Sequence, residues 1–228
     1  MAMETERSLW FVPVYLTILP MSRFPLLQRT YPTTFFPPNN DETPETLFRD
    51  GVFTDQGHMR WVHRDNPSAI LYCVSGCYSP ENNQYGASAF VYGPQIIGYP
   101  GSGMFCLDTR IRGPMEQLAP QTEERAHLQA AVSALTFARS VEPTPRIRTL
   151  VIATHRDHLA HGAAIYTPQW VADHWRGENG ERVANCDIWL ELLAEVEGLA
   201  QRGIDVQFWR LSSIGGRMGS ARLAAEAA

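Results

Sequence analysis

The order of its strand and helix patterns constrains this chain more than any other feature of the sequence. Three segments, 69–76, 86–93 and 103–113, are apolar or alternate between apolar and polar residues, as β-strands do, and short turns separate them. The period changes to that of a helix at 122–139, and another strand pattern follows at 148–154. This order indicates an α/β fold in which the helical crossover places 148–154 parallel to 69–76.

The C-terminal part continues the alternation of elements. The pattern predicts a long amphipathic helix at 186–203, a fifth strand at 205–212 and a short closing helix. In sheets of this kind a site lies at the carboxyl ends of the strands, where the direction of winding changes. Ser75 ends the first strand and His155 ends the fourth, so we expect these two residues to face each other across one crevice.

Composition changes near residue 66, which divides the chain into an extension, 1–66, packed on a core domain, 67–228. Prolines interrupt the extension too often for a long helix. Its apolar run Leu9–Leu19 follows two glutamates, contains Pro13 and is shorter than the roughly 20 apolar residues of a membrane helix. We therefore predict a cytoplasmic protein that makes no contact with a membrane.

The ionisable residues limit the chemistry further. All 19 basic residues are arginine, which excludes a Schiff base and a P-loop lysine. The net charge of −5 gives no general attraction to nucleic acid. The four cysteines are scattered without the spacing of a zinc site, so they are expected to be free thiols. We expect no cofactor and no bound metal, and the sequence does not indicate an oligomeric state.

Six motifs, in this order, resemble those of the ribonuclease H family, and in particular its fungal members. They are VSGCYS at 74–79, QTEERAHL at 121–128, ATHRDHL at 153–159, WRGENGERVANCDIW at 175–189, FWRL at 208–211 and SARLAAEAA at 220–228. The resemblance covers residues 69–228 with compatible spacings. It implies a ribonuclease H-like mixed five-stranded sheet with helices on both faces, preceded by the N-terminal extension.

The same resemblance implies that the family's two-metal chemistry is absent. Its four metal-binding carboxylates fall, motif by motif, on Ser75, His127, His155 and Ala221, none of which is an acid. Mg²⁺ is held by carboxylates and water rather than by imidazoles, so we expect no ribonuclease H activity. The turn that contacts nucleic acid in the family carries two glutamates here, which makes a nucleic-acid partner unfavourable.

The altered crevice leaves two main hypotheses for function. In the first, His127 and His155 exchange protons with a small organic ligand, with Ser75 as a third catalytic residue, because imidazole titrates near neutral pH. A fungal biosynthetic or modifying step on a small, largely apolar molecule would suit such a site. In the second, the protein is a pseudoenzyme that acts as a binding or scaffold module. We favour an enzyme, and residual binding or hydrolysis of nucleic acid is a third alternative.

Further residues around the crevice each have two interpretations, one functional and one structural. Arg156, Trp175 and Asn185 are predicted to contact the substrate, but Trp175 also suits core packing and Asn185 the start of a helix. The histidines at 155, 158 and 161, with a fourth from the 122–139 helix, are an alternative metal site. The spacing by three rotates the third histidine away from the first, so we do not assign a metal.

Overall fold

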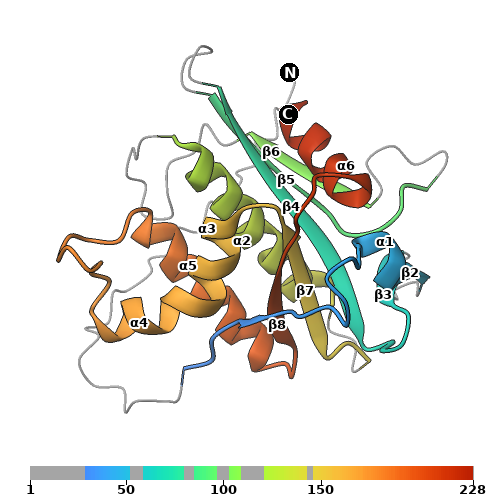
Figure 1. Cartoon of the computed structure of the whole chain (residues 1–228), viewed down its shortest axis with the longest axis horizontal. Coiled ribbons are helices and arrows are strands. Elements are labelled where there is room, and N and C mark those ends of the chain that lie inside the picture. Colours follow the sequence, from blue (N-terminus) through green and yellow to red (C-terminus); the bar gives the residue numbers. More distant parts are fainter. Residues whose placement is uncertain are drawn as a thin grey trace, which may run out of the picture.

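In the computed structural model, an eight-stranded mixed sheet lies between two layers of helices (Figure 1). The structure describes residues 29–51, 59–79, 85–96, 103–108, 121–142 and 146–227. The sheet is centred on one long strand, β4 (Ala69–Ser79), which has different neighbours along its two halves. Within the part of the chain described, no helix is long and apolar enough to cross a membrane.

On one side of β4 the strands run parallel. The order outward from β4 is β7 (Thr149–Thr154), β8 (Asp205–Arg210) and β1 (Thr33–Thr34). On the other side the pairing is antiparallel, with β3 (Arg60–His63) and β2 (Phe48–Gly51) against the first half of β4, and β5 (Tyr85–Val91) and β6 (Met104–Asp108) against the second. The predicted parallel pair is confirmed, since Ala69 to Cys73 of β4 pair with Thr149 to Ala153 of β7.

The sheet contains more strands than the five predicted from the sequence. Those five correspond to β4, β5, β6, β7 and β8, and the three additional strands all come from residues 33–63. Residues of the predicted extension therefore form three of the strands of the sheet. The domain boundary at residue 66 stays a prediction. The apolar run Leu9–Leu19 and the end of the segment predicted at 103–113 lie outside the described residues.

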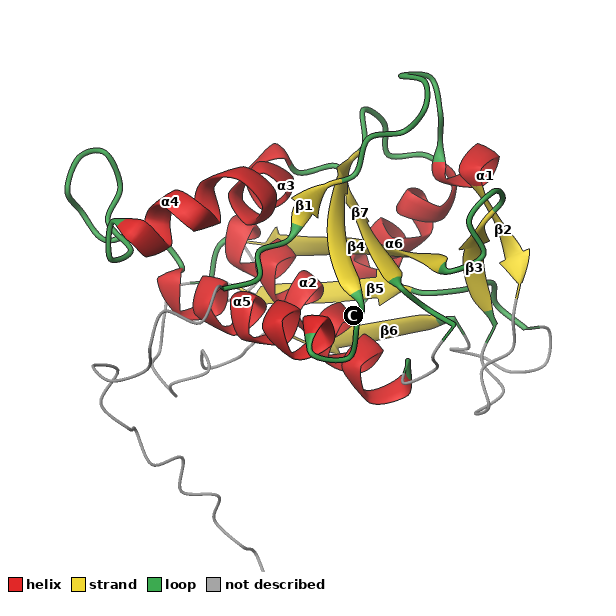
Figure 2. Cartoon of the chain, turned by 90° about the horizontal axis from the view of Figure 1, so that it is seen from below, coloured by secondary structure: helices red, strands yellow, loops and turns green. Residues whose placement is uncertain are grey.

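Helices cover both faces of the sheet, as predicted (Figure 2). One face carries α2 (Glu123–Val141) and α5 (Cys186–Ala200), and the other carries α1 (Pro44–Leu47) and α6 (Gly216–Glu226). A run of short helices follows β7, namely α3 (Asp157–His161), the π-helical η1 (Gly162–Tyr166) and α4 (Thr167–Ala172). This run begins at the carboxyl end of β7 and therefore borders the predicted site.

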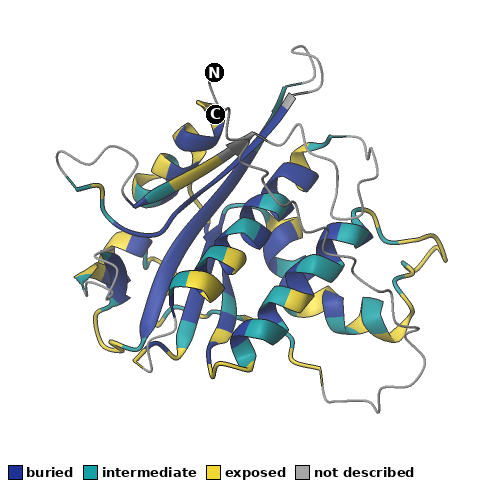
Figure 3. Ribbon diagram, turned by 180° about the vertical axis from the view of Figure 1, so that it is seen from behind, coloured by how far each residue is buried: buried dark blue, intermediate teal, exposed yellow. Residues whose placement is uncertain are grey.

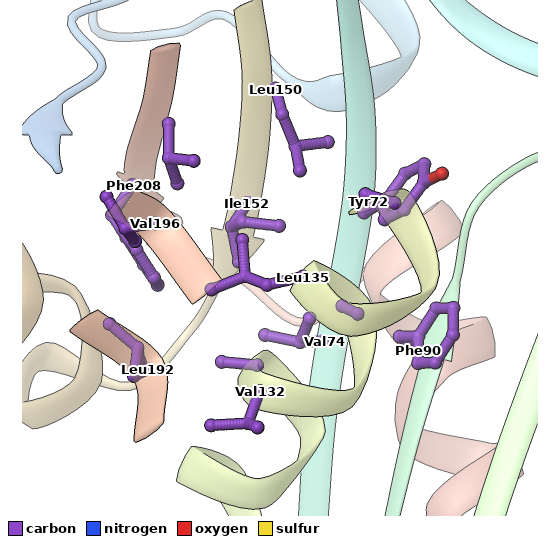
Figure 4. Close-up of a cluster of buried hydrophobic side chains, with 14 of the residues drawn as sticks. Tyr72, Val74, Phe90, Val132, Leu135, Leu150, Ile152, Leu192, Val196 and Phe208 are labelled. Carbon is purple, nitrogen blue, oxygen red and sulfur yellow. The ribbon is translucent and has the colours of Figure 1, made fainter. Parts of the chain in front are cut away.

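Side chains of the central strands alternate between two hydrophobic cores. On the α2 and α5 face, Tyr72 and Val74 of β4 meet Leu135 of α2 and Val196 of α5 (Figure 4). On the α6 face, Cys73 packs with residues of β7, β8 and α6. Figure 3 shows the result, since β4 is buried along most of its length while the helices bury one side only. Each large apolar side chain so buried stabilises the fold by about 1.5–3 kcal/mol.

Candidate functional site

β4 and β7 bring two of the predicted residues near each other, but Ser75 does not end its strand as predicted, because β4 continues to Ser79. The paired register ends at Cys73 and Ala153, and Ser75 and His155 each follow two residues later. Continued by two residues, the parallel register sets Ser75 opposite His155. The register agrees with the predicted parallel pair, but of these two residues only His155 lines the cavity described below.

The first turn of α2 brings His127 to the same place. Thr122 caps this helix by accepting a hydrogen bond from the backbone N–H of Arg125, at 3.1 Å. Gly76 lets the helix approach β4, because a Cβ at that position would lie 2.5 Å from the backbone nitrogen of His127. The N–H of Gly76 donates to Nδ1 of His127 at 2.9 Å, which fixes the orientation of the ring.

His127 and His155 form a close pair of imidazole rings. Their ring centroids are 5.2 Å apart and the planes meet at 79°, edge to face. His127 is 1% exposed, and burial, followed by the neighbouring His155, lowers its pKa from 6.5 to about 3. Burial and then Arg222 of α6 lower the pKa of His155. Both rings are therefore uncharged at neutral pH.

Arg156 lies against the other edge of His127. Its Nε is 3.0 Å from Nε2 of His127, and its guanidinium also forms an ion pair with Glu123. A neutral imidazole accepts a hydrogen bond at one nitrogen only, so the ring cannot accept fully from both Gly76 and Arg156. In the protonated ring both nitrogens carry a hydrogen, and these hydrogens would face the Gly76 N–H and Nε of Arg156, which are donors themselves. This arrangement further favours the neutral form of His127.

A cavity of about 280 Å³ opens beside this pair of rings. Its polar lining consists of Glu124, His127, His155, Arg156, Asp157 and His158, and Leu159 is the apolar member. Asp157 also accepts a hydrogen bond from Nε of Arg210 at 2.5 Å. The cavity thus offers neutral imidazoles, carboxylates and one guanidinium to a ligand.

Ser75 lies behind the cavity rather than in its lining. Its side chain is fully buried, and its Oγ has no hydrogen-bond partner among the described residues. The same holds for Nδ1 of His155. A buried hydroxyl does not meet a ligand in the cavity, so this geometry favours a supporting role for Ser75, and a catalytic role at the reacting atoms stays a prediction.

Two of the three predicted substrate contacts are not brought to the cavity. Trp175 packs against the core beside Trp170, with ring centroids 6.4 Å apart. Asn185 starts α5, but its side chain caps no N–H of that helix and instead accepts from Nη1 of Arg125 at 3.2 Å. Arg125 is also held by both carboxylate oxygens of Asp187. These residues brace α5 against α2.

Sequence reasoning assigned Glu124 and Asp157 to no site at the crevice, and it named His158 only in the alternative metal site. Glu124, Asp157 and His158 all line the cavity. Their positions follow from the short helix α3, which begins directly after β7 and folds Asp157 and His158 over the strand ends. Across the described segments, no group of three or more His, Cys, Asp or Glu side chains is arranged to hold a metal ion.

Comparison with known proteins places these features in context. No protein-family profile matches the sequence. A ribonuclease H of Granulibacter bethesdensis is 31% identical over 115 residues, which cover 49% of this chain and 69% of that protein. Ribonuclease H1 of Rattus norvegicus is 30% identical over 192 residues, or 82% of this chain and 56% of the rat protein.

A solved structure is similar in fold. The foamy viral protease–reverse transcriptase in complex with an RNA/DNA hybrid superimposes with a TM-score of 0.51, at 14% identity, over 69% of this chain and 19% of the viral chain. At this identity the likeness concerns the arrangement of strands and helices. It agrees with the topology derived above from β4, β7 and α2.

Proposed function

Because the chain belongs to the ribonuclease H family, we propose that it keeps the family's fold and uses the crevice between β4, β7 and α2 for proton transfer on a small polar molecule, in place of two-metal hydrolysis. The relatives described above are bacterial and mammalian proteins named ribonuclease H. The activity in that name is therefore the competing candidate, and the experiments below separate the two.

The residue types at the strand ends support the absence of two-metal chemistry. By the motif resemblance, the family's acids fall on Ser75, His127, His155 and Ala221, and Ala221 is fully buried against the sheet. Magnesium requires hard, negatively charged oxygen ligands, and an imidazole held neutral by burial does not replace them. Among the residues that the structure describes, the two carboxylates of the cavity, on Glu124 and Asp157, belong to no group of three side chains that could hold a metal ion.

The pair of neutral imidazoles 5.2 Å apart is the observation that carries the proposal. His155 is half-buried and lines the cavity, so it is the group we assign as the proton acceptor. His127 is locked by Gly76 and stays uncharged beside His155, so His155 is the ring of the pair that can take up the proton. A positioned base of this kind accelerates proton transfer by about 10²–10⁴-fold.

The lining of the cavity supports a small and polar substrate. Its volume of about 280 Å³ lies near the lower end of the range for ligand pockets, about 300–1,000 Å³. Arg156 offers a donor to a carboxylate or carbonyl group, while Glu124 offers an acceptor to a hydroxyl or amine. A largely apolar substrate, in contrast, would leave these groups without partners.

The first experiment tests the competing activity. We expect the purified protein to leave an RNA/DNA hybrid uncut in the presence of Mg²⁺ or Mn²⁺. Cleavage that disappears in Asp157→Asn, while the exposed-residue control Asp173→Asn retains it, would mean that the cavity carboxylates hold metal, and the proposal would be wrong.

The second experiment tests the assigned base. A fragment library of small polar molecules is screened by the imidazole resonances of His127 and His155. We expect fragments that shift the His155 resonances and lose binding in His155→Ala, with binding retained in the exposed control His174→Asn. If every fragment binds the His155→Ala variant as well as the unmodified protein, His155 does not contact the ligand. Binding through His155 without exchange of a substrate proton favours the pseudoenzyme.

A further inference from the structure

A second and larger hollow lies outside the proposed catalytic cavity. It is a groove of about 690 Å³ between residues 34–45, which lead from β1 into α1, and the loop that joins β8 to α6. Arg210 lines this groove and Asp157 lines the catalytic cavity, and the ion pair between these two residues separates the two hollows. Nothing in the proposed proton transfer uses this groove.

Aromatic side chains line one part of the groove. Phe35 packs on Trp209 with ring centroids 5.0 Å apart. Phe36, the next residue, is 81% exposed, which is the largest exposed fraction among the large hydrophobic side chains that the structure describes. Exposed aromatic surface over a hollow is typical of ligand sites, because water is displaced from it at little cost.

Carboxylates also line the groove, and two of them lack a counter-charge. Glu45 accepts a hydrogen bond from the backbone N–H of Arg217, at 2.7 Å, and so caps the start of α6. Asp41 and Glu42 form no ion pair with any residue that the structure describes. The one arginine in the lining, Arg210, is already neutralised by Asp157. The groove therefore carries a net negative charge.

From this combination we infer that the groove between residues 34–45 and the β8–α6 loop binds a small organic ammonium ion. An ammonium group is attracted to the faces of aromatic rings and to carboxylates, whereas an anion is repelled and a neutral molecule gains from the rings alone. The alkyl groups of such a cation would cover Phe36, and its charge would face Asp41 and Glu42.

The test compares two molecules of the same shape that differ in charge. Choline and its neutral isostere 3,3-dimethylbutan-1-ol are titrated into the full chain by calorimetry. We expect choline to bind at least about tenfold more tightly, because a cation–π contact with a nearby carboxylate is worth about 1–2 kcal/mol. Equal affinity for the two molecules, or no binding of choline, would overturn the inference.

Matched variants locate the site. The double variant Asp41→Asn/Glu42→Gln keeps the shape of both side chains, and we expect it to weaken choline binding about tenfold. Phe36→Ala should weaken it by a smaller factor. The controls are Glu178→Gln and Leu223→Ala, which change exposed residues away from the groove. If the controls weaken binding as much as the groove variants do, choline binds elsewhere and the inference is wrong.

Discussion

Polar groups are buried near both ends of the contact between β4 and α2. The two ends differ in whether these buried groups carry a charge. At one end Arg60 and Glu142 form an ion pair in which both side chains are 1% exposed, and the hydroxyl of Tyr72 donates to the same carboxylate at 2.9 Å. At the other end Gly76 and His127 meet in a hydrogen bond without a formal charge.

This difference shows two solutions to the cost of removing a charge from water. Arg60 and Glu142 keep their charges and compensate one another, with the guanidinium of Arg60 also 4.8 Å from the centroid of the Tyr92 ring. His127 is instead uncharged at neutral pH, because burial lowers its pKa to about 3. The first solution gives a closed end, and the second leaves a neutral ring that borders the cavity.

Breaking the charged end should have the largest effect. Glu142→Leu leaves Arg60 buried without its partner, and we expect a loss of about 3–5 kcal/mol in the free energy of unfolding, measured by urea denaturation. The double variant Arg60→Leu/Glu142→Leu should recover much of this loss. Glu226→Ala, which removes an exposed ion pair with Arg222, is the control and should cost less than about 1 kcal/mol. A similarly small effect of Glu142→Leu would contradict the ion-pair account.

Overpacking the neutral end should come next. In Gly76→Ala the added Cβ would lie 2.4 Å from the carbonyl carbon of Ala126, so α2 must move away from β4. We expect a loss of about 1–3 kcal/mol together with a changed environment for His127, visible in its imidazole resonances. Gly219→Ala is the matched control, because its nearest contact is an ordinary 3.5 Å and alanine favours the helix. Unchanged resonances in Gly76→Ala would show that Gly76 does not position the ring.

The pH dependence of stability sharpens the comparison. The pKa of His127 is about 3 in the folded protein against 6.5 for the free side chain, so between these values the unfolded chain binds more protons. The contribution of this residue is complete above pH 6.5 and is lost as the pH falls toward 3. We expect a slope of at most about 1.4 kcal/mol per pH unit. His127→Gln can still accept from Gly76 but cannot titrate, and its stability should depend less on pH over this range.

The smallest effect is expected at the exposed ion pair between Asp157 and Arg210. Both side chains are largely in water, so Arg210→Gln should change the free energy of unfolding by less than about 1 kcal/mol. The same variant removes the cation between the cavity and the groove. A loss of several kcal/mol would show that this pair belongs with the buried charges rather than with the surface.

The sequence predicted the central sheet because its strands are long and regular. The five strands from β4 to β8 have clear patterns, and their order sets the parallel pair that carries Ser75 and His155. β1 was not predictable, since two residues have no period and Thr33–Thr34 become a strand only beside β8. Long-range pairing of this kind leaves no trace in a local pattern.

The candidate site was predicted in part. His127 and His155 were expected together and are confirmed as neighbours by their ring separation. Ser75 was expected at the end of its strand, whereas β4 continues to Ser79 and the hydroxyl of Ser75 is fully buried. Asp157 and His158 reach the cavity because α3 starts immediately after β7, and the length of that connection could not be derived from their residue types.

The pairing of β1 with β8 also bears on the order in which the chain folds. Thr33 pairs with Gln207, which is 174 residues away (207 − 33). During synthesis β3 and β4 are available to each other almost at once, whereas residues 33–45 must wait until β8 has left the ribosome. The groove built from residues 34–45 therefore closes only after β8 has been synthesised, and a ligand bound there would show that β1 and β8 have paired.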